Sequence, residues 1–244
     1  MQSGVVLSIV VPCLNHIEIT KGFLSSIFLN TENNFEVIVI DDGSDDETQN
    51  IEFMFPEIDL VIRNRENKGF AYAVNQGIKM SRGGFIAIFN NDMIVKEGWD
   101  VKLINAIGDY GMISGTLKEP PISVEEFEKM EEPERDEICD WEKGMPWVFK
   151  KEVFEKIGIF DERFEICQYE DIDLLVRMAI GGYKFASLRN CFIYHYSSLT
   201  QKTDLKERIP FDYARRNAER FVEKWGVSYP DGVNYPLFYE RGRI

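Results

Sequence analysis

Phe35 to Ser44 reads FEVIVIDDGS, a run of apolar and β-branched residues that ends in two carboxylates and a glycine turn. Phe35 to Ile40, which is apolar except for Glu36, predicts a strand that is buried on both faces. The same character occurs at Val5 to Val11 (VVLSIVV) and at Phe85 to Phe89 (FIAIF). Buried strands that end in polar turns are typical of a parallel sheet in an α/β protein.

Helical segments are predicted between these strands. Ile17 to Leu29 has apolar residues at helical spacing, and Gly69 to Ser81 also has helical character. Between them, Asp45 to Met54 is polar and helix-capable, and Asp59 to Arg63 is a short strand candidate. Because strands alternate with helices, we expect βαβ units and a mostly parallel central sheet flanked by helices on both faces.

The second half of the chain has a different composition. Leu117 to Met145 contains two adjacent prolines and a strongly acidic stretch. We interpret it as an inserted lid or acceptor loop, with an ordinary solvated helix as an equal alternative. Beyond it, helices are expected at Val153 to Gly158 and Asp171 to Gly181, and late strands at Phe185 to Leu188 and Cys191 to Tyr194.

The composition argues against several classes of protein. The 42 acidic residues against 28 basic ones give a net charge of -14, which opposes binding to nucleic acid or to an anionic membrane. The four cysteines are scattered without CxxC spacing, so we expect reduced thiols in a cytoplasmic protein. Val5 to Val11 is too short to span a bilayer, so at most peripheral membrane contact is expected. Dinucleotide, P-loop and nucleophile-elbow motifs are absent from the sequence.

Two polar clusters follow predicted strands. Asp41-Asp42-Gly43-Ser44 could accept hydrogen bonds from a nucleoside, although a turn and helix cap would explain it equally well. Asn90-Asn91-Asp92 offers oxygen ligands for Mg²⁺ or Mn²⁺ between phosphates, with a polar turn as the alternative. Ligands of open α/β sheets bind outside the carboxyl ends of the strands, so Asp41, Asp42 and Asp92 are expected to converge.

Two further candidates lie later in the chain. Glu170 and Asp171 form a carboxylate pair that could supply a general base, one neighbour raising the pKa of the other. Acidic residues in a first helical turn also stabilise the helix dipole, so a structural role is the alternative. His195 follows a predicted strand and is either a structural histidine or a metal ligand.

Taken in order, these segments resemble the inverting GT-A glycosyltransferases of family 2. The similarity of each segment alone is modest, but the occurrence of all of them in the family's order across most of the chain is specific to this family. The segments are LSIVVPCLN (Leu7 to Asn15), VIVIDDGSDDET (Val37 to Thr48), NKGFAYAVNQGI (Asn67 to Ile78), FNND (Phe89 to Asp92), FKKEVFEKIGIFDERF (Phe149 to Phe164), YEDIDLLVRMAIGGY (Tyr169 to Tyr183) and Tyr194-His195.

The resemblance implies a GT-A fold and roles for individual residues. The nucleotide-sugar donor would be held by Pro12, Asn15, Asp41, Asp42, Asn67, Gly69 and Asn91. Asp92 and His195 would bind Mn²⁺ or Mg²⁺, and Asp171, next to Glu170, would be the catalytic base. Asn90 stands where an aspartate is common, and this N-x-D variant occurs in rhamnosyl- and galactofuranosyl-type branches, which favours a dTDP or UDP donor.

The implied activity is transfer of a sugar, with inversion, from a nucleotide diphosphate to an acceptor hydroxyl, usually of a glycan. The implied domain covers residues 1–225, with a nucleotide-binding half at 1–95, an acceptor half at 96–225 and an aromatic tail at 226–244. A non-catalytic nucleotide-sugar-binding module is one alternative, favoured only by Asn90. A nucleotidyltransferase is another, but the loop Pro12 to Asn15 lacks the expected glycines and cations.

Overall fold

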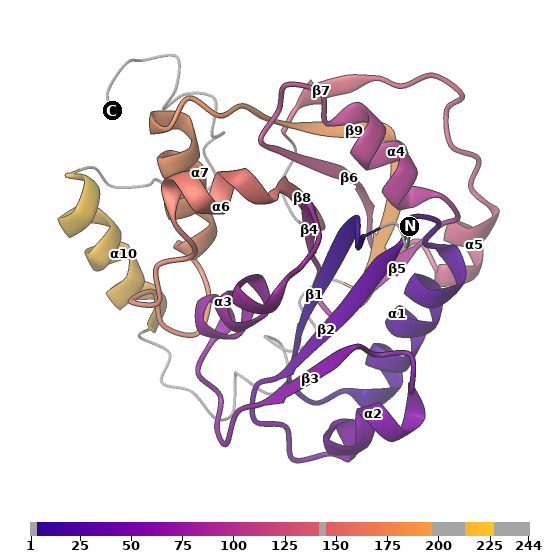
Figure 1. Cartoon of the computed structure of the whole chain (residues 1–244), viewed down its shortest axis with the longest axis horizontal. Helices are drawn as coiled ribbons and strands as arrows, with labels where there is room; N and C mark the ends of the chain where they lie inside the picture. The colour runs from indigo at the N-terminus through magenta and orange to yellow at the C-terminus, as the bar shows by residue number, and fades with distance from the viewer. Residues whose placement is uncertain (1–3, 142–144, 197–212, 227–244) are drawn as a thin grey trace.

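The computed structural model describes residues 4–141, 145–196 and 213–226, and its centre is a nine-stranded sheet (Figure 1). Four strands of the N-terminal half are parallel neighbours, in the order β3 (Leu60–Arg63), β2 (Phe35–Asp41), β1 (Leu7–Cys13) and β4 (Phe85–Ile88). The sheet continues through β8 (Trp147–Lys150), β6 (Met112–Lys118), β9 (Phe185–His195) and β5 (Met93–Val95), and β7 (Ile138–Asp140) pairs with β9.

The predicted α/β architecture is confirmed. Strands β6 and β9 run in the direction of the first four strands, and β5, β7 and β8 run opposite to them. One face of the sheet is covered by α1 (Ile17–Asn30), α2 (Ile51–Met54) and α4 (Trp99–Ala106), and the 3₁₀ turn η1 (Glu47–Asn50) precedes α2. The other face is covered by α3 (Phe70–Met80), α6 (Lys151–Ile157) and α7 (Glu170–Ile180).

The apolar runs are explained by burial on both faces. In β1, Ile9 and Val11 pack in the core under α1, while Val10 between them packs in the core under α3. All three side chains are fully buried. Since each contributes about 1.5–3 kcal/mol when removed from water, a strand with helices on both sides favours apolar residues at every position.

The segment at 117–145 is partly built into the sheet. Its first residues, Leu117 and Lys118, end β6, and the later β7 adds a short strand against β9. Between them α5 (Val124–Lys129) places Phe127 in a small core with its ring centroid 5.5 Å from that of Tyr194. This acidic segment is therefore partly buried through Phe127.

Two other features differ from the sequence expectations. The two predicted late strands are one strand, β9, whose register with β6 shifts between Gly115 and Thr116. A Cβ on Gly115 would lie only 2.6 Å from the carbonyl oxygen of Cys191. Strand β9 therefore passes close to the backbone of Gly115 at this irregularity. Helix α10 (Tyr213–Trp225) was not anticipated, and the aromatic tail beyond residue 226 lies outside the described residues.

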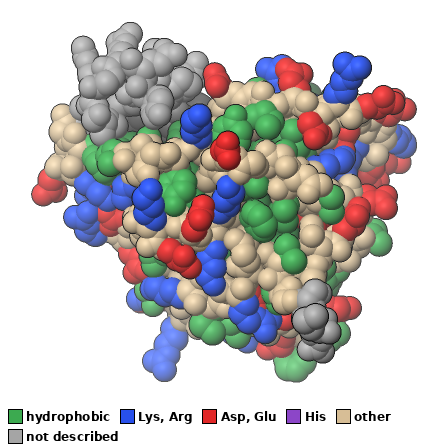
Figure 2. All heavy atoms as spheres, turned by 45° about the horizontal axis from the view of Figure 1, so that its top comes forward, with side chains coloured by type: hydrophobic (Ala, Val, Ile, Leu, Met, Phe, Trp, Pro, Cys, Tyr) green, Lys and Arg blue, Asp and Glu red, His purple; other side chains and the backbone are tan. Residues whose placement is uncertain are grey.

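The surface is mixed in charge where it can be viewed. Figure 2 shows acidic and basic side chains interspersed over one face, so the described residues there form no continuous basic surface. Over the three described ranges, none of the helices combines the length and apolarity needed to cross a bilayer.

Candidate functional site

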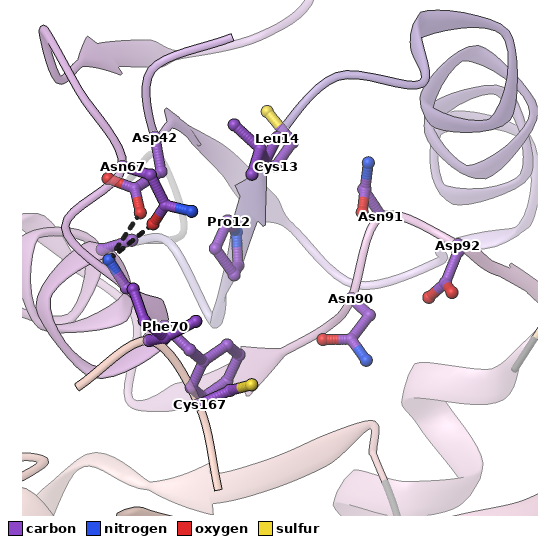
Figure 3. Close-up of a pocket in the computed structure, with 13 residues that line it drawn as sticks. Pro12, Cys13, Leu14, Asp42, Asn67, Phe70, Asn90, Asn91, Asp92 and Cys167 are labelled. Carbon is purple, nitrogen blue, oxygen red and sulfur yellow. Dashed lines mark hydrogen bonds between the residues drawn. The ribbon is translucent and has the colours of Figure 1, made fainter. Parts of the chain in front are cut away.

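A pocket opens at the carboxyl ends of β1, β2 and β4 (Figure 3). Asp42 and Asn67 lie on one side, Asn90, Asn91 and Asp92 lie on the other, and Pro12 lies between them. Six predicted residues line the pocket, namely Pro12, Asp42, Asn67, Gly69, Asn91 and Asp92. The remaining lining residues are Cys13, Leu14, Phe70, Ala73, Asn90, Ile166 and Cys167.

Asp42 organises the loop on one side of this pocket. Its buried carboxylate accepts hydrogen bonds from Asn64 Nδ2 at 2.7 Å, Lys68 N at 3.0 Å and Gly69 N at 2.9 Å. Burial raises the pKa of Asp42, and these hydrogen bonds oppose that rise only in part. A carboxylate has about four acceptor positions, so Asp42 can hold the loop and still face a ligand.

Asp41 and Asn15 do not line the pocket but fix the turn beside it. Asp41 Oδ1 accepts a hydrogen bond from Ser44 N at 2.9 Å, and Asn15 N donates to Ser44 Oγ at 2.8 Å. Asn15 Oδ1 in turn accepts from Asp45 N at 2.9 Å. The loops after β1 and β2 are therefore tied together through Ser44.

Gly69 brings a distant loop into the pocket. Its backbone has φ +93, and a Cβ at this position would lie 2.7 Å from Ile166 N. Next to it, Phe70 N donates to the Ile166 carbonyl at 2.6 Å. Ile166 and Cys167 thus close one wall of the pocket, which the sequence did not predict. The positive φ of Gly69 is what allows this close approach, and one glycine in a sequence does not reveal such a backbone conformation.

Asp92 and His195 meet at the ends of neighbouring segments. Met93 pairs with His195 across β5 and β9, and His195 Nε2 lies 3.2 Å from Asp92 Oδ1. On its other side, His195 Nδ1 lies 3.1 Å from Glu119 Oε1. Burial lowers the pKa of His195, but the carboxylates of Asp92 and Glu119 raise it by more, so the net shift is upward.

This pair fits a divalent cation of the manganese or magnesium type. The described residues contain no group of three or more His, Cys, Asp or Glu side chains placed to hold a metal ion. Asp92 and His195 would therefore supply two ligands, one oxygen and one nitrogen. The remaining positions suit phosphate and water oxygens, which Mg²⁺ sites commonly retain.

Glu170 and Asp171 lie in the first turn of α7, shortly after Cys167, and neither lines the pocket. Glu170 is buried, and within the described ranges its Oε2 atom has no hydrogen-bond partner, whereas Asp171 is partly exposed. Burial raises the pKa of both carboxyls, and the charge of Asp171 raises that of Glu170 further.

The sequence is similar to those of known glycosyltransferases. The family model "Glycosyl transferase family 2" matches residues 8–167. An uncharacterized glycosyltransferase of Haemophilus influenzae is 26% identical, over 96% of this chain and 83% of its own length. Glycosyltransferase GlyG of Streptococcus pneumoniae is 37% identical, over 37% of this chain and 31% of its own length.

Solved structures share the fold. One structure of S. aureus TarS has a TM-score of 0.61 at 17% identity, covering 96% of this chain and 77% of TarS. GalNAc-T7, solved with UDP, GalNAc and Mn²⁺, has a TM-score of 0.72 at 16% identity. That match covers 91% of this chain and 49% of GalNAc-T7.

Proposed function

We propose, from the premise that this chain belongs to glycosyltransferase family 2, that it moves a sugar from a UDP- or dTDP-sugar to an acceptor hydroxyl of a glycan, with inversion. The observation that carries the proposal is the convergence of Asp42 and Asp92 on one pocket from the ends of two different parallel strands. Family membership makes the chain a glycosyltransferase. The donor, acceptor and stereochemistry are the proposed part.

The donor side is assigned from the pocket lining. Asp42 and Asn67 would face the base and ribose, because carboxylate and amide oxygens accept hydrogen bonds from base N–H and ribose hydroxyl groups. Asn90, Asn91 and Asp92 on the opposite side would face the diphosphate and the sugar. UDP in the GalNAc-T7 structure, and the N-x-D variant at Asn90 to Asp92, support a UDP- or dTDP-sugar.

Asp92 and His195 would hold Mn²⁺ or Mg²⁺. Such an ion, when bound, neutralises negative charge on the departing diphosphate. The net charge of the chain, -14, gives the diphosphate a repulsive background, which is a physical reason to expect a cation here. The Mn²⁺ in the GalNAc-T7 structure also supports this assignment.

Asp171 would act as the general base. It takes the proton of the acceptor hydroxyl while that oxygen bonds to the anomeric carbon and the bond from this carbon to the diphosphate oxygen breaks. The products are the glycosylated acceptor, the nucleoside diphosphate and protonated Asp171. Attack opposite the leaving group inverts the anomeric configuration.

Nucleotide release with and without acceptor tests the proposed function. Saturation with a correct UDP- or dTDP-sugar at about 100 times its Kd is expected to stabilise the fold by about 2.7 kcal/mol and to raise Tm by several degrees. Adding a glycan acceptor should then accelerate release of the nucleoside diphosphate. A binding module would show the Tm shift without release. A nucleotidyltransferase would transfer the nucleoside monophosphate to the acceptor and release the sugar 1-phosphate instead of the nucleoside diphosphate.

Asp92→Asn is expected to weaken Mn²⁺ binding in the presence of UDP by at least roughly 10- to 100-fold, since losing a residue that only orients metal ligands already has an effect of that size. Titration followed by electron paramagnetic resonance measures this directly. Asp109→Asn is the matched control, because it removes the same charge at an exposed turn outside the pocket lining. Equal affinities for the Asp92 variant and the wild type would remove Asp92 from the metal site.

A further inference from the structure

The loop that closes the pocket is strained. Ile166, Gln168 and Tyr169 have φ values of 61, 76 and 73, in the left-handed region that favours glycine. For a β-branched residue such as Ile166 this conformation is a genuine outlier. Strain of this kind persists only where the surrounding structure holds the backbone in place, and it is concentrated at functional sites.

The side chain of Asn217, on α10, is hydrogen-bonded to the backbone of this loop. Asn217 is fully buried, and its Nδ2 donates to the carbonyls of Glu165 at 2.8 Å, Cys167 at 3.0 Å and Gln168 at 3.1 Å. Its Oδ1 accepts from Glu165 N at 3.0 Å. Asn217 therefore fixes the backbone on both sides of Ile166, while Phe70 N holds the Ile166 carbonyl from the opposite direction.

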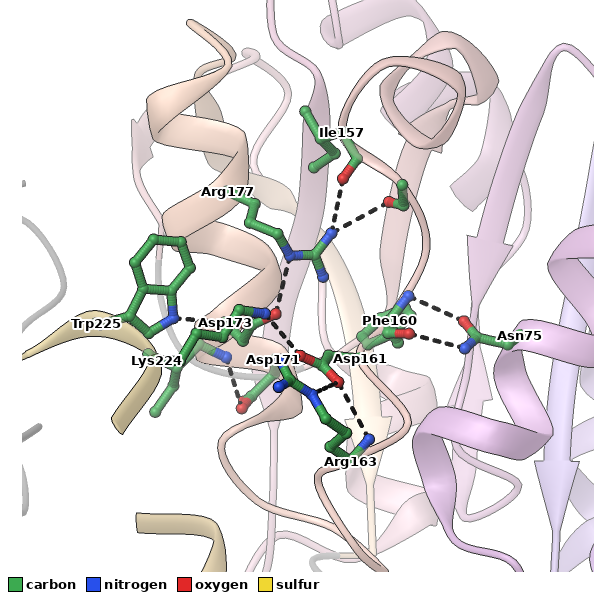
Figure 4. Close-up of polar contacts among 12 residues, drawn as sticks. Asn75, Ile157, Phe160, Asp161, Arg163, Asp171, Asp173, Arg177, Lys224 and Trp225 are labelled. Carbon is green, nitrogen blue, oxygen red and sulfur yellow. Dashed lines mark hydrogen bonds and ion pairs between the residues drawn. The ribbon is translucent and has the colours of Figure 1, made fainter. Parts of the chain in front are cut away.

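Helix α10 is itself anchored to the segments on either side of the loop. Arg216 and Arg220 reach the Glu165 carboxylate at 2.7 Å and 2.5 Å. At the end of the helix, Lys224 lies 2.6 Å from Asp173 Oδ1 and 2.7 Å from Asp161 Oδ2, and Trp225 Nε1 donates to Asp173 Oδ1 at 2.9 Å. Figure 4 shows Lys224 and Trp225 against Asp173 of α7.

We infer that Asn217 is a positioning residue for sugar transfer, acting on the acceptor side of the site. It holds Ile166 and Cys167 in the pocket wall and sets the direction in which the chain enters α7, where Asp171 lies. Asn217 does not line the pocket and so acts through the loop. The inference rests on the proposed function.

Loss of Asn217 would leave three loop carbonyls without their donor and allow the strained residues to relax. A displacement of about 1 Å of a catalytic group can cost up to about 100-fold in rate. The donor side would change little, because Asp42 holds Lys68 N and Gly69 N independently of α10. The effect is therefore expected in kcat and not in the KM for the donor.

Asn217→Ala is expected to lower kcat about tenfold or more, with the donor KM within about twofold of wild type. Asp100→Ala is the matched control. Asp100 is also fully buried and holds a loop, accepting from Glu32 N at 3.1 Å and Asn33 N at 2.9 Å, but it does not line the pocket. It should lower Tm comparably and leave kcat unchanged.

Alkylation of Cys167, followed by mass spectrometry, gives a readout independent of turnover. Cys167 is partly exposed and its Sγ lies 3.6 Å from the hydroxyl of Tyr213 at the start of α10. Its alkylation rate should rise severalfold in Asn217→Ala and stay unchanged in Asp100→Ala. If the alanine variant is not obtained folded, Asn217→Ser retains one donor and should show an intermediate kcat.

Three results would overturn the inference. One is wild-type kcat in folded Asn217→Ala or Asn217→Ser, together with an unchanged alkylation rate. Another is an equal loss of kcat in Asn217→Ala and Asp100→Ala, which would reduce the role of Asn217 to general stability. An inactive wild-type enzyme would overturn the proposed function as well, whereas an active wild type with an unaffected Asn217 variant overturns only the inference.

Discussion

Asp171→Asn is expected to lower kcat by about 10²- to 10⁴-fold, the usual contribution of a positioned general base. An amide cannot take the proton of the acceptor hydroxyl. The substitution is otherwise conservative, because Asn retains the Oδ1 atom that accepts a hydrogen bond from Ile172 N at 2.8 Å. Donor affinity should stay within about twofold of wild type, because the proton transfer that this variant prevents occurs only in the transition state. Acceptor-dependent release of the nucleoside diphosphate measures the effect.

Glu170→Gln is the matched comparison within the same pair. Burial and the neighbouring charge of Asp171 raise the pKa of Glu170, which favours its uncharged form, and a glutamine amide is uncharged and similar in size. Turnover should therefore fall by less than about tenfold, below the range for loss of the base. A large loss in Glu170→Gln with an active Asp171→Asn would reverse the two assignments.

The pH profile gives an independent check. Burial raises the pKa of Asp171, and a base acts only when it is deprotonated, so activity increases as pH rises through that pKa. The acidic limb of kcat/KM should therefore lie above about pH 4, where an unperturbed aspartate titrates. The residual activity of Asp171→Asn should lack this limb. A wild-type limb at or below pH 4 would contradict the assignment.

The sheet and the meeting of Asp42 and Asp92 in one pocket could be predicted because they depend on local patterns. A run such as Val37 to Ile40 is apolar at every position only where both faces of a strand are buried, and β2 is buried in this way. Parallel neighbours end at the same edge of the sheet. Asp42 and Asp92, which follow two such strands, therefore had to lie near each other, and both line the pocket.

The pocket wall formed by Ile166 and Cys167 could not be predicted because it depends on contacts between distant segments. The inward stripe of α10 consists of the buried Asn217 and Phe221 and the partly buried Trp225, at helical spacing. The asparagine interrupts the apolar pattern that would reveal this stripe. Asn217 is at this position because it bonds to loop backbone, which a local pattern does not show. Likewise, nothing in the acidic segment distinguishes Glu119, the carboxylate that contacts His195.

Gly69→Ala is expected to be the most damaging small change in the pocket, and Gly158→Ala is a closely matched control. The two glycines have nearly the same backbone, φ 93 and ψ 164 at Gly69 against φ 80 and ψ 172 at Gly158. This region is almost exclusive to glycine and costs other residues about 1–3 kcal/mol. A Cβ on Gly158 meets only Arg177 Nη1 at 4.0 Å, whereas one on Gly69 lies 2.7 Å from Ile166 N.

The difference between the two variants therefore isolates the contact with Ile166. In both variants the unfolding free energy should fall because alanine is strained in this backbone conformation. In Gly69→Ala it should fall by roughly a further 1–3 kcal/mol from overpacking, measured by urea denaturation. It should also weaken nucleotide binding about tenfold, since moving Gly69 disturbs the 2.9 Å bond from its N–H to Asp42 in the donor loop. Equal stabilities and unaltered nucleotide affinity in both variants would show that the loop carrying Ile166 can withdraw freely. In that case Gly69 would not couple the loop held by Asp42 to the loop that carries Ile166.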